Sequence, residues 1–209
     1  MTSATLKSRV LAAAAAVEAS RDELCRLDAA AGDGDHGVTM ALAARAVRKA
    51  IEAAPGSTAP ELVTALAMAM GSVGGAIGPI YASGLLGVAK VLRGMPADEP
   101  LTVKQLLDCA EAAEGAITAL GHAKLGDKTI LDALHPAAEA LRDANAAGSD
   151  LDEALAAAAA AAGHGAAGTA AMAASLGRAS RLGERSRGLA DPGATSFALV
   201  VDALATAGH

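Results

Sequence analysis

The residues most able to do chemistry lie in one short stretch, LDAAAGDGDHG, which begins at position 27. Asp28, Asp33, Asp35 and His36 fall within nine positions, and the glycines among them let the backbone turn tightly enough to aim these side chains together. Carboxylate oxygens with no cysteine partner select Mg²⁺, Ca²⁺ or Mn²⁺ over zinc. The stretch therefore predicts a site for a hard cation. The alternative is an Asp-rich turn that caps a helix starting near Val38.

Two familiar ligand sites do not fit this stretch. An EF-hand loop that starts at Asp33 requires glutamate at its twelfth position, where Ala44 stands. Gly32, Gly34 and Gly37 match the dinucleotide-binding pattern, but no strand is expected before them. A bare pyrophosphate there would also meet like charges, each pair costing about 4 kcal/mol at roughly 4 Å. Phosphate is therefore expected at this loop only through a bridging Mg²⁺.

A second candidate is the glycine-rich loop GSVGGAIGP at residues 71–79, which precedes another expected helix. The backbone N–H groups of such a loop, with the positive end of a helix dipole behind them, form an anion site. The alternative is that its small residues only allow close helix packing.

Two further loops carry basic residues. The sequence GHAKLGDKT, residues 121–129, looks like a Walker motif with one residue too many, because Asp127 separates the glycine from Lys128, so a P-loop is rejected. Asp127 and Thr129 instead predict a helix start, with Lys128 or Thr129 toward phosphate. Residues 177–193 hold four arginines among glycine and proline, which indicates an ordered lid over an anion. A solvated basic loop is the alternative.

Helices must position these loops, because alanine is the best helix former and the residues that favour strands are scarce. Turn signals separate segments of helical length, expected at about residues 4–27, 38–53, 58–70, 80–93, 102–121, 128–147, 150–175 and 194–205. Eight helices joined by short loops pack as antiparallel neighbours. Because no long linker or repeat interrupts them, we expect residues 1–209 to form one all-α domain.

Composition excludes several classes of protein. The chain has 209 residues, a net charge of −6 and 1% aromatic residues, which disfavours nucleic acid as a partner. No stretch of eighteen residues is both free of charge and strongly apolar, so no membrane span is expected. The alanine run after Lys7 and Arg9 leads into Glu18, which disfavours a secretory signal. Cys25 and Cys109 form no CxxC pair and predict two buried thiols in a cytoplasmic protein.

Taken together, the motifs resemble a known family. They are GDGDHG at 32–37, GGAIGP at 74–79, GDKT at 126–129, GRAS followed by LGERS at 177–186, and DPGATS at 191–196. In this order and spacing they are similar to the nucleotide-binding L subunit of dihydroxyacetone kinase, the DhaL family, over essentially the whole chain. The resemblance implies an eight-helix antiparallel barrel that holds a nucleotide in the loops at one rim.

The resemblance also implies the ligands of this site. ADP or ATP would be held through two Mg²⁺ ions on Asp28, Asp33 and Asp35. The residues implied to contact the nucleotide are His36, Gly37, Val38, Thr39, Ala76, Ile77, Gly121, Ile130, Arg178, Asp191, Pro192 and Gly193. Family members often carry Ser or Thr where Ile77 stands, so the backbone of this loop is expected to act in place of a side-chain hydroxyl.

The implied reaction is phosphoryl transfer, and no catalytic base is expected beyond the metal and nucleotide ligands. Dihydroxyacetone would be held on a separate K subunit, and ADP would be rephosphorylated by the M subunit, a phosphoprotein of the phosphoenolpyruvate phosphotransferase system. The alternative is an ATP-dependent kinase subunit for dihydroxyacetone or a related ketose such as erythrulose. A homodimer is expected. From another class, a non-catalytic helical barrel that holds a lipid also remains open, because alanine-rich helices leave room inside.

Overall fold

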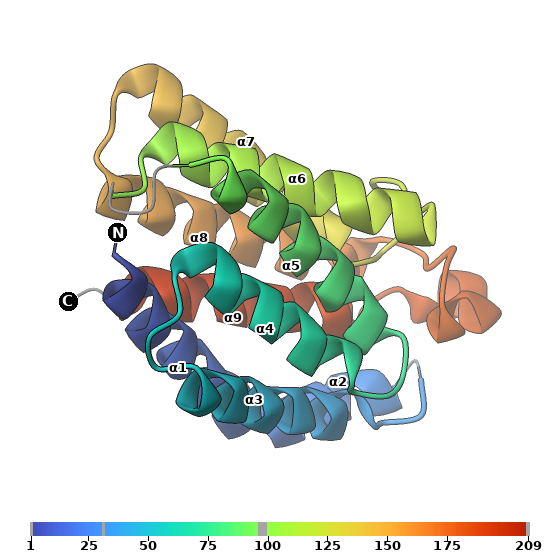
Figure 1. The fold of residues 1–209 in the computed structure, drawn as a ribbon. Helices are drawn as coiled ribbons and strands as arrows, with labels where there is room; N and C mark the ends of the chain where they lie inside the picture. The colour runs from blue at the N-terminus through green and yellow to red at the C-terminus, as the bar shows by residue number, and fades with distance from the viewer. Residues whose placement is uncertain (1, 31, 96–99, 208–209) are drawn as a thin grey trace.

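The computed structural model describes residues 2–30, 32–95 and 100–207, and all regular secondary structure in these residues is helical (Figure 1). The all-α prediction is therefore confirmed. The α-helices are α1 (Ser3–Ala19), α2 (Arg21–Ala29), α3 (His36–Ala53), α4 (Ala59–Gly71), α5 (Ile77–Arg93), α6 (Val103–Gly121), α7 (Leu131–Ala147), α8 (Leu151–Gly168) and α9 (Pro192–Thr206). Two 3₁₀ segments, η1 (Thr169–Ala171) and η2 (Arg178–Ser186), lie between α8 and α9.

The helix starts that carry capping residues were predicted well. The side chains of Thr102 and Asp150 accept hydrogen bonds from the backbone N–H groups three residues on, at 3.2 Å and 2.8 Å. The N–H of Thr58 donates to Glu61 at 2.9 Å, as a capping box requires. These local hydrogen bonds satisfy N–H groups that a helix start otherwise leaves without partners.

Several helix bounds differ from the prediction, and α5, for example, begins at Ile77 and not at residue 80. The helix expected at residues 4–27 breaks at Ser20, whose backbone leaves the helical region and separates α1 from α2. The helix expected from residue 128 begins at Leu131 because the preceding residues form a tight loop. The helix expected to reach residue 175 ends at Gly168, where the chain tightens into η1. Alanine-rich sequence gives no local stop signal at such points, so the bounds depend on packing.

The helices follow one another around a closed ring. From α3 to α9 each helix packs against the next, and α9 packs against both α8 and α1, which in turn contacts α3 (Figure 1). The short helix α2 lies beside α3. Loops gather at the two ends of the ring, and the described residues nearest both termini lie at the end opposite η2 (Figure 1).

Small side chains bring α7 and α8 close together. Ala133, Ala154 and Ala162 are fully buried between neighbouring helices. A methyl group added at Gly165 would lie 2.2 Å from the carbonyl oxygen of Asp132, so only glycine fits this approach. The alanine-rich α8 is thus a close-packing surface along one face.

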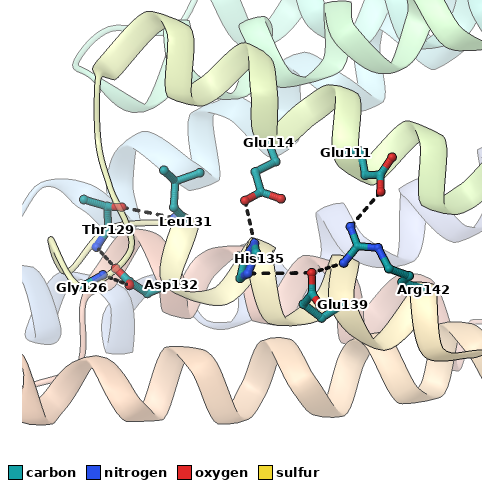
Figure 2. Close-up of polar contacts among 9 residues, drawn as sticks. All are labelled: Glu111, Glu114, Gly126, Thr129, Leu131, Asp132, His135, Glu139 and Arg142. Atoms are coloured by element: carbon teal, nitrogen blue, oxygen red, sulfur yellow. Dashed lines mark hydrogen bonds and ion pairs between the residues drawn. The ribbon is translucent and has the colours of Figure 1, made fainter.

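Polar contacts between partly exposed side chains join α6 to α7. Glu114 Oε1 lies 2.8 Å from His135 Nδ1, and Glu111 Oε1 lies 2.8 Å from Arg142 Nη2 (Figure 2). All four side chains are partly exposed, and such pairs contribute only about 0–1 kcal/mol each. Burial of apolar side chains between α6 and α7 therefore contributes more of the stabilising free energy than these contacts do.

The interior of the ring holds an apolar cavity of about 290 Å³. Helices α1 and α4 to α9 contribute apolar side chains to the wall of this cavity. One from each helix, in order, is Leu6, Val63, Leu85, Leu106, Leu134, Leu155 and Phe197. The one aromatic hydroxyl at its edge, on Tyr81, is buried without a hydrogen-bond partner among the described residues.

None of the described helices combines the length and the apolar character that a membrane crossing requires. Both cysteines are free thiols, as predicted, but only Cys109 is buried and Cys25 is half-buried. The expectation of two buried thiols was therefore wrong for Cys25, which lies on the partly open face of α2.

Candidate functional site

Four loops meet at the end of the ring on the right of Figure 1 and line a cavity of about 330 Å³. Each of the loops that the sequence singled out contributes to its wall. The predicted site residues that line it are Asp28, Asp35, His36, Thr39, Ala76, Ile77, Gly121, Ile130, Arg178, Asp191, Pro192 and Gly193. Asp33, Gly37 and Val38 lie beside the cavity without lining it.

The three aspartates form one cluster. Each offers a carboxylate oxygen that lies within 4.8 Å of the other two, with Asp28 buried at the end of α2 and Asp33 and Asp35 exposed. Such close like charges repel one another unless a cation neutralises them. Three carboxylate oxygens without sulfur or imidazole form a donor set that suits Mg²⁺. The residues present therefore fit a hard divalent cation.

Helix capping accounts for only one of these carboxylates. Asp28 Oδ2 accepts a hydrogen bond from the N–H of His36 at 3.2 Å, so Asp28 caps the start of α3. Asp35 stands at the N-cap position of that helix, yet its side chain accepts no capping hydrogen bond. The Asp35 side chain therefore does not cap α3.

A guanidinium group faces the exposed carboxylates. Arg178 Nη1 forms an ion pair with Asp33, and Nη2 lies 3.2 Å from Asp35 Oδ1. Arg178 begins η2, a 3₁₀ segment within residues 177–193, where an ordered lid was expected. Of the other arginines in this segment, Arg187 pairs with Glu184 at 2.6 Å, whereas Arg181 is exposed. Of the four arginines in this segment, Arg178 lines the cavity and the other three do not.

The start of α5 supplies backbone donors to the cavity. Ala76 holds the N-cap position, and among the described residues no side chain caps this first turn. Ile77 is buried in the apolar core against Met40, so its side chain packs and does not reach an anion. A methyl group at Gly78 would lie 2.3 Å from the carbonyl oxygen of Val73, which explains why this tight turn carries glycine. The backbone N–H groups at the start of α5 therefore suit an anion.

His36 lines the cavity and is partly buried. Burial lowers its pKa, and the nearby Asp28 carboxylate only partly opposes this effect. Its Nε2 atom lies 3.1 Å from Ser196 Oγ, and that hydroxyl donates to the carbonyl oxygen of Gly193 at 3.0 Å. Ser196 thus links His36 to the first turn of α9. Ser196 was quoted only as part of a motif, and its burial gives it this role.

Asp191 is a partly buried carboxylate at the start of α9. Its Oδ2 atom accepts the N–H of Ala194 at 2.7 Å, and its own N–H donates to Thr169 Oγ1 at 2.7 Å. Burial raises the pKa of Asp191 to about 6, although the Ala194 N–H and the Lys128 ammonium oppose the rise. Asp191 therefore combines helix capping with a place in the cavity wall.

The loop before α7 is folded around Asp132. Its Oδ1 atom accepts the N–H of Gly126 at 2.6 Å, and its Oδ2 atom accepts the N–H of Thr129 at 2.8 Å (Figure 2). The predicted helix start at Asp127 and Thr129 was therefore wrong, since both residues belong to this loop. Asp127 instead accepts hydrogen bonds from the N–H of Lys124 at 2.7 Å and from the hydroxyl of Ser175 at 2.5 Å.

The cavity also has apolar walls that sequence reasoning missed. Ile80, Ile117, Ala123 and Leu176 line it together with the glycines and polar residues. Ile80 and Ile117 lie inside helices, where an apolar residue is indistinguishable in sequence from a core position. Only the tertiary structure separates the two roles.

The cavity of this helical protein thus combines an acidic cluster, an arginine and the uncapped start of a helix, a set of groups that fits a metal ion together with an anion. The DAK2 domain family matches residues 30–206, and the chain belongs to this family. It is 35% identical over 196 residues to the ADP-binding subunit DhaL of the PEP-dependent dihydroxyacetone kinase 2 of Listeria innocua, covering 91% of this chain and 88% of that protein.

Longer relatives contain a region similar to most of this chain. L-erythrulose 1-kinase of Mycolicibacterium smegmatis is 39% identical over 187 residues, which are 87% of this chain and 32% of that protein. The crystal structure of the dihydroxyacetone kinase of C. freundii superimposes with a TM-score of 0.75 and 27% identity, covering 98% of this chain and 34% of that one. A second structure of that kinase contains AMP-PNP and Mg²⁺. The relatives named here are kinases.

Proposed function

We propose that the cavity binds ADP or ATP with Mg²⁺ and that the chain is the nucleotide-binding subunit of a dihydroxyacetone kinase. The observation that carries this proposal is the cluster of three carboxylates, with ligand oxygens within 4.8 Å of one another, on a cavity that the start of α5 and Arg178 also line. A nucleotide phosphate cannot approach these carboxylates without a cation between them. Bound Mg²⁺ would supply that charge and would neutralise phosphate oxygens during transfer.

The residues proposed to form the site fall into groups that bind the metal ions, the phosphates and the rest of the nucleotide. Asp28, Asp33 and Asp35 would hold two Mg²⁺ ions, and His36 to Thr39 would lie along the phosphates with the backbone of Ala76 and Ile77. A methyl group at Gly37 would lie 1.9 Å from the carbonyl oxygen of Arg21, so this position contributes backbone only. Gly121, Ile130, Arg178 and Asp191 to Gly193 would frame the rest of the nucleotide. The apolar wall suits a purine ring, which is flat and largely apolar.

The acceptor is proposed to lie on another protein. The relatives that match this chain over most of their length are named as subunits, while the erythrulose kinases are about three times longer than the matched region. We therefore infer a K-type subunit that carries dihydroxyacetone and an M-type phosphoprotein that regenerates ATP from bound ADP. The erythrulose kinases among the relatives support the alternative of an ATP-dependent subunit for a larger ketose.

Calorimetric titration with ADP and ATP, with and without Mg²⁺, tests the nucleotide site. We expect binding that requires the metal, and the absence of Mg²⁺-dependent binding of either nucleotide would overturn the proposal. Reconstitution with a K-type subunit then identifies the phosphoryl donor. ATP and a phosphorylated M-type subunit are supplied in separate assays, and the one that supports turnover is the donor. Comparing dihydroxyacetone with erythrulose in this assay identifies the acceptor.

The interior cavity of about 290 Å³ favours a second candidate, an apolar guest such as a lipid inside the ring. This guest would occupy a different cavity from the nucleotide, although Ile117 and Ile130 line both. Mass spectrometry of an organic extract of the purified protein tests it, and an extract without lipid would remove this candidate.

A further inference from the structure

Lys128 has an unusual environment for a lysine. Its side chain is buried, with only 4% of the residue exposed. Its Nζ atom donates to three backbone carbonyl oxygens, those of Met172 at 3.2 Å, Ser186 at 2.5 Å and Leu189 at 2.8 Å. An ammonium group has three N–H donors and a neutral amine has two. Only the protonated form therefore satisfies all three contacts, although burial lowers the pKa of this lysine.

All three carbonyl groups belong to the segment at residues 172–189, which carries Arg178. Carbonyl dipoles oriented toward one buried cation stabilise it in place of water. The same contacts hold the two ends of the segment together, because Met172 lies at its start and Leu189 at its end. Between them, Arg178 extends to the carboxylates of Asp33 and Asp35.

The backbone of Lys128 is itself held in place. Its φ angle is +63°, in the left-handed region that a lysine rarely adopts. Asp132 accepts hydrogen bonds from the N–H groups of Gly126 and Thr129, on either side of this residue (Figure 2). Asp132 belongs to the first turn of α7, so the position of the ammonium is tied to the helical ring.

We propose that Lys128 is a positioning residue, whose ammonium holds the segment 172–189 so that Arg178 reaches the nucleotide cavity. Lys128 also lines the cavity, but its ammonium uses its three donors on carbonyl oxygens, so it acts on the bound phosphates through Arg178. This inference rests on the proposed function, since it assigns a role toward the nucleotide. It differs from the sequence-based expectation that Lys128 or Thr129 faces phosphate.

Hydrogen exchange of the protein without nucleotide tests the first half of the inference. Lys128→Met keeps the length of the side chain and removes the cation. We expect amide exchange in residues 172–189 to become about tenfold faster or more, while α4 and α5 keep their protection. Lys124→Met, an exposed lysine in the same loop, is the matched control and should leave exchange unchanged. Unchanged exchange in Lys128→Met would overturn the inference.

A double-mutant cycle with Arg178→Gln tests the second half. If Lys128 acts through Arg178, Lys128→Met weakens Mg²⁺-ADP binding about tenfold in the wild-type background and has little effect when Arg178 is already replaced. Independent, multiplicative losses would mean that Lys128 contacts the nucleotide itself, which would overturn the inference. Wild-type protein that binds no Mg²⁺-ADP overturns the proposed function, and hydrogen exchange still decides whether Lys128 holds the segment.

Two further variants keep the test decisive should Lys128→Met fail to fold. Lys128→Arg retains a cation with several donors, and we expect it to restore most of the protection of residues 172–189. Lys128→Gln offers donors without charge and should restore less. Equal protection in these two variants would show that the positive charge is not needed, contrary to the inference.

Discussion

Arg178 Nη2 lies 3.2 Å from Asp35 Oδ1, although 143 positions separate the two residues in the chain. The same guanidinium contacts Asp33, so one side chain partly neutralises two of the three clustered carboxylates. All three side chains are about half exposed, and water and salt screen their interaction. The contact is therefore weak enough for a divalent cation to replace.

Arg178→Gln should affect the metal and the nucleotide in opposite directions. Without nucleotide, we expect Mg²⁺ to bind about threefold to tenfold more tightly, because the competing cation is gone. Mg²⁺-ADP should bind about tenfold more weakly, because a phosphate partner is also lost. Calorimetry measures both constants, and Arg181→Gln is the control in the same segment. A variant that binds Mg²⁺ alone no better than wild type would contradict this competition.

Asp33→Ala and Asp35→Ala should each lose metal and nucleotide together. We expect Mg²⁺-ADP affinity to fall by roughly a hundredfold, because two metal ligands cannot hold the ion as three do. The far-UV circular dichroism should stay that of the wild type, since both side chains are exposed and outside the core. Asp22→Ala, on the exposed face of α2, is the matched control. Unchanged affinity in both variants would restrict these carboxylates to a local structural role.

Asp191→Asn should change how stability depends on pH. The pKa of Asp191 rises from its usual 3.8 to about 6 on folding. The folded state therefore binds the proton of the Asp191 carboxyl group more tightly than the unfolded state does, and this proton binding stabilises the fold. Its stabilising effect is complete at low pH and is lost as pH rises through about 6. Asparagine keeps the capping oxygen without titrating. We expect the variant to gain about 2 kcal/mol over wild type between pH 4 and 7.

Urea unfolding of both proteins at several pH values, without Mg²⁺ or nucleotide, measures this difference. The other carboxylates titrate alike in the two proteins and cancel in the comparison. A difference that stays constant from pH 4 to 7 would mean that Asp191 has the same pKa folded and unfolded.

Two glycines in α8 should respond oppositely to alanine. A methyl group at Gly165 would meet the carbonyl of Asp132 at 2.2 Å, so Gly165→Ala should lower the free energy of unfolding by about 1–3 kcal/mol. At Gly163 nothing lies within 4 Å, so Gly163→Ala should raise it by about 0.5–1 kcal/mol through helix propensity. Thermal unfolding of the two variants and the wild type measures both changes in stability. Equal effects would show that α7 and α8 do not approach this closely.

The residues of the sequence by themselves predict an all-helical chain and the loops that do chemistry. Alanine content favours helices everywhere, and Thr58, Thr102 and Asp150 mark helix starts because capping acts within three residues. The carboxylate loop is also readable, since Asp28, Asp33 and Asp35 are neighbours in sequence. These features depend on short-range hydrogen bonds and residue type, which a single sequence contains.

Only the tertiary structure decided how the loops meet. The break at Ser20, the apolar wall from Ile80 and Ile117, and the pairing of Arg178 with Asp35 have no local signal. The clearest case is Lys128, which lines the cavity while its ammonium is bound by carbonyl groups 44 to 61 positions away, contacts that no sequence pattern indicated. Such contacts form only when packed helices bring distant segments to one end of the ring, and the free energy of that packing is shared among many residues.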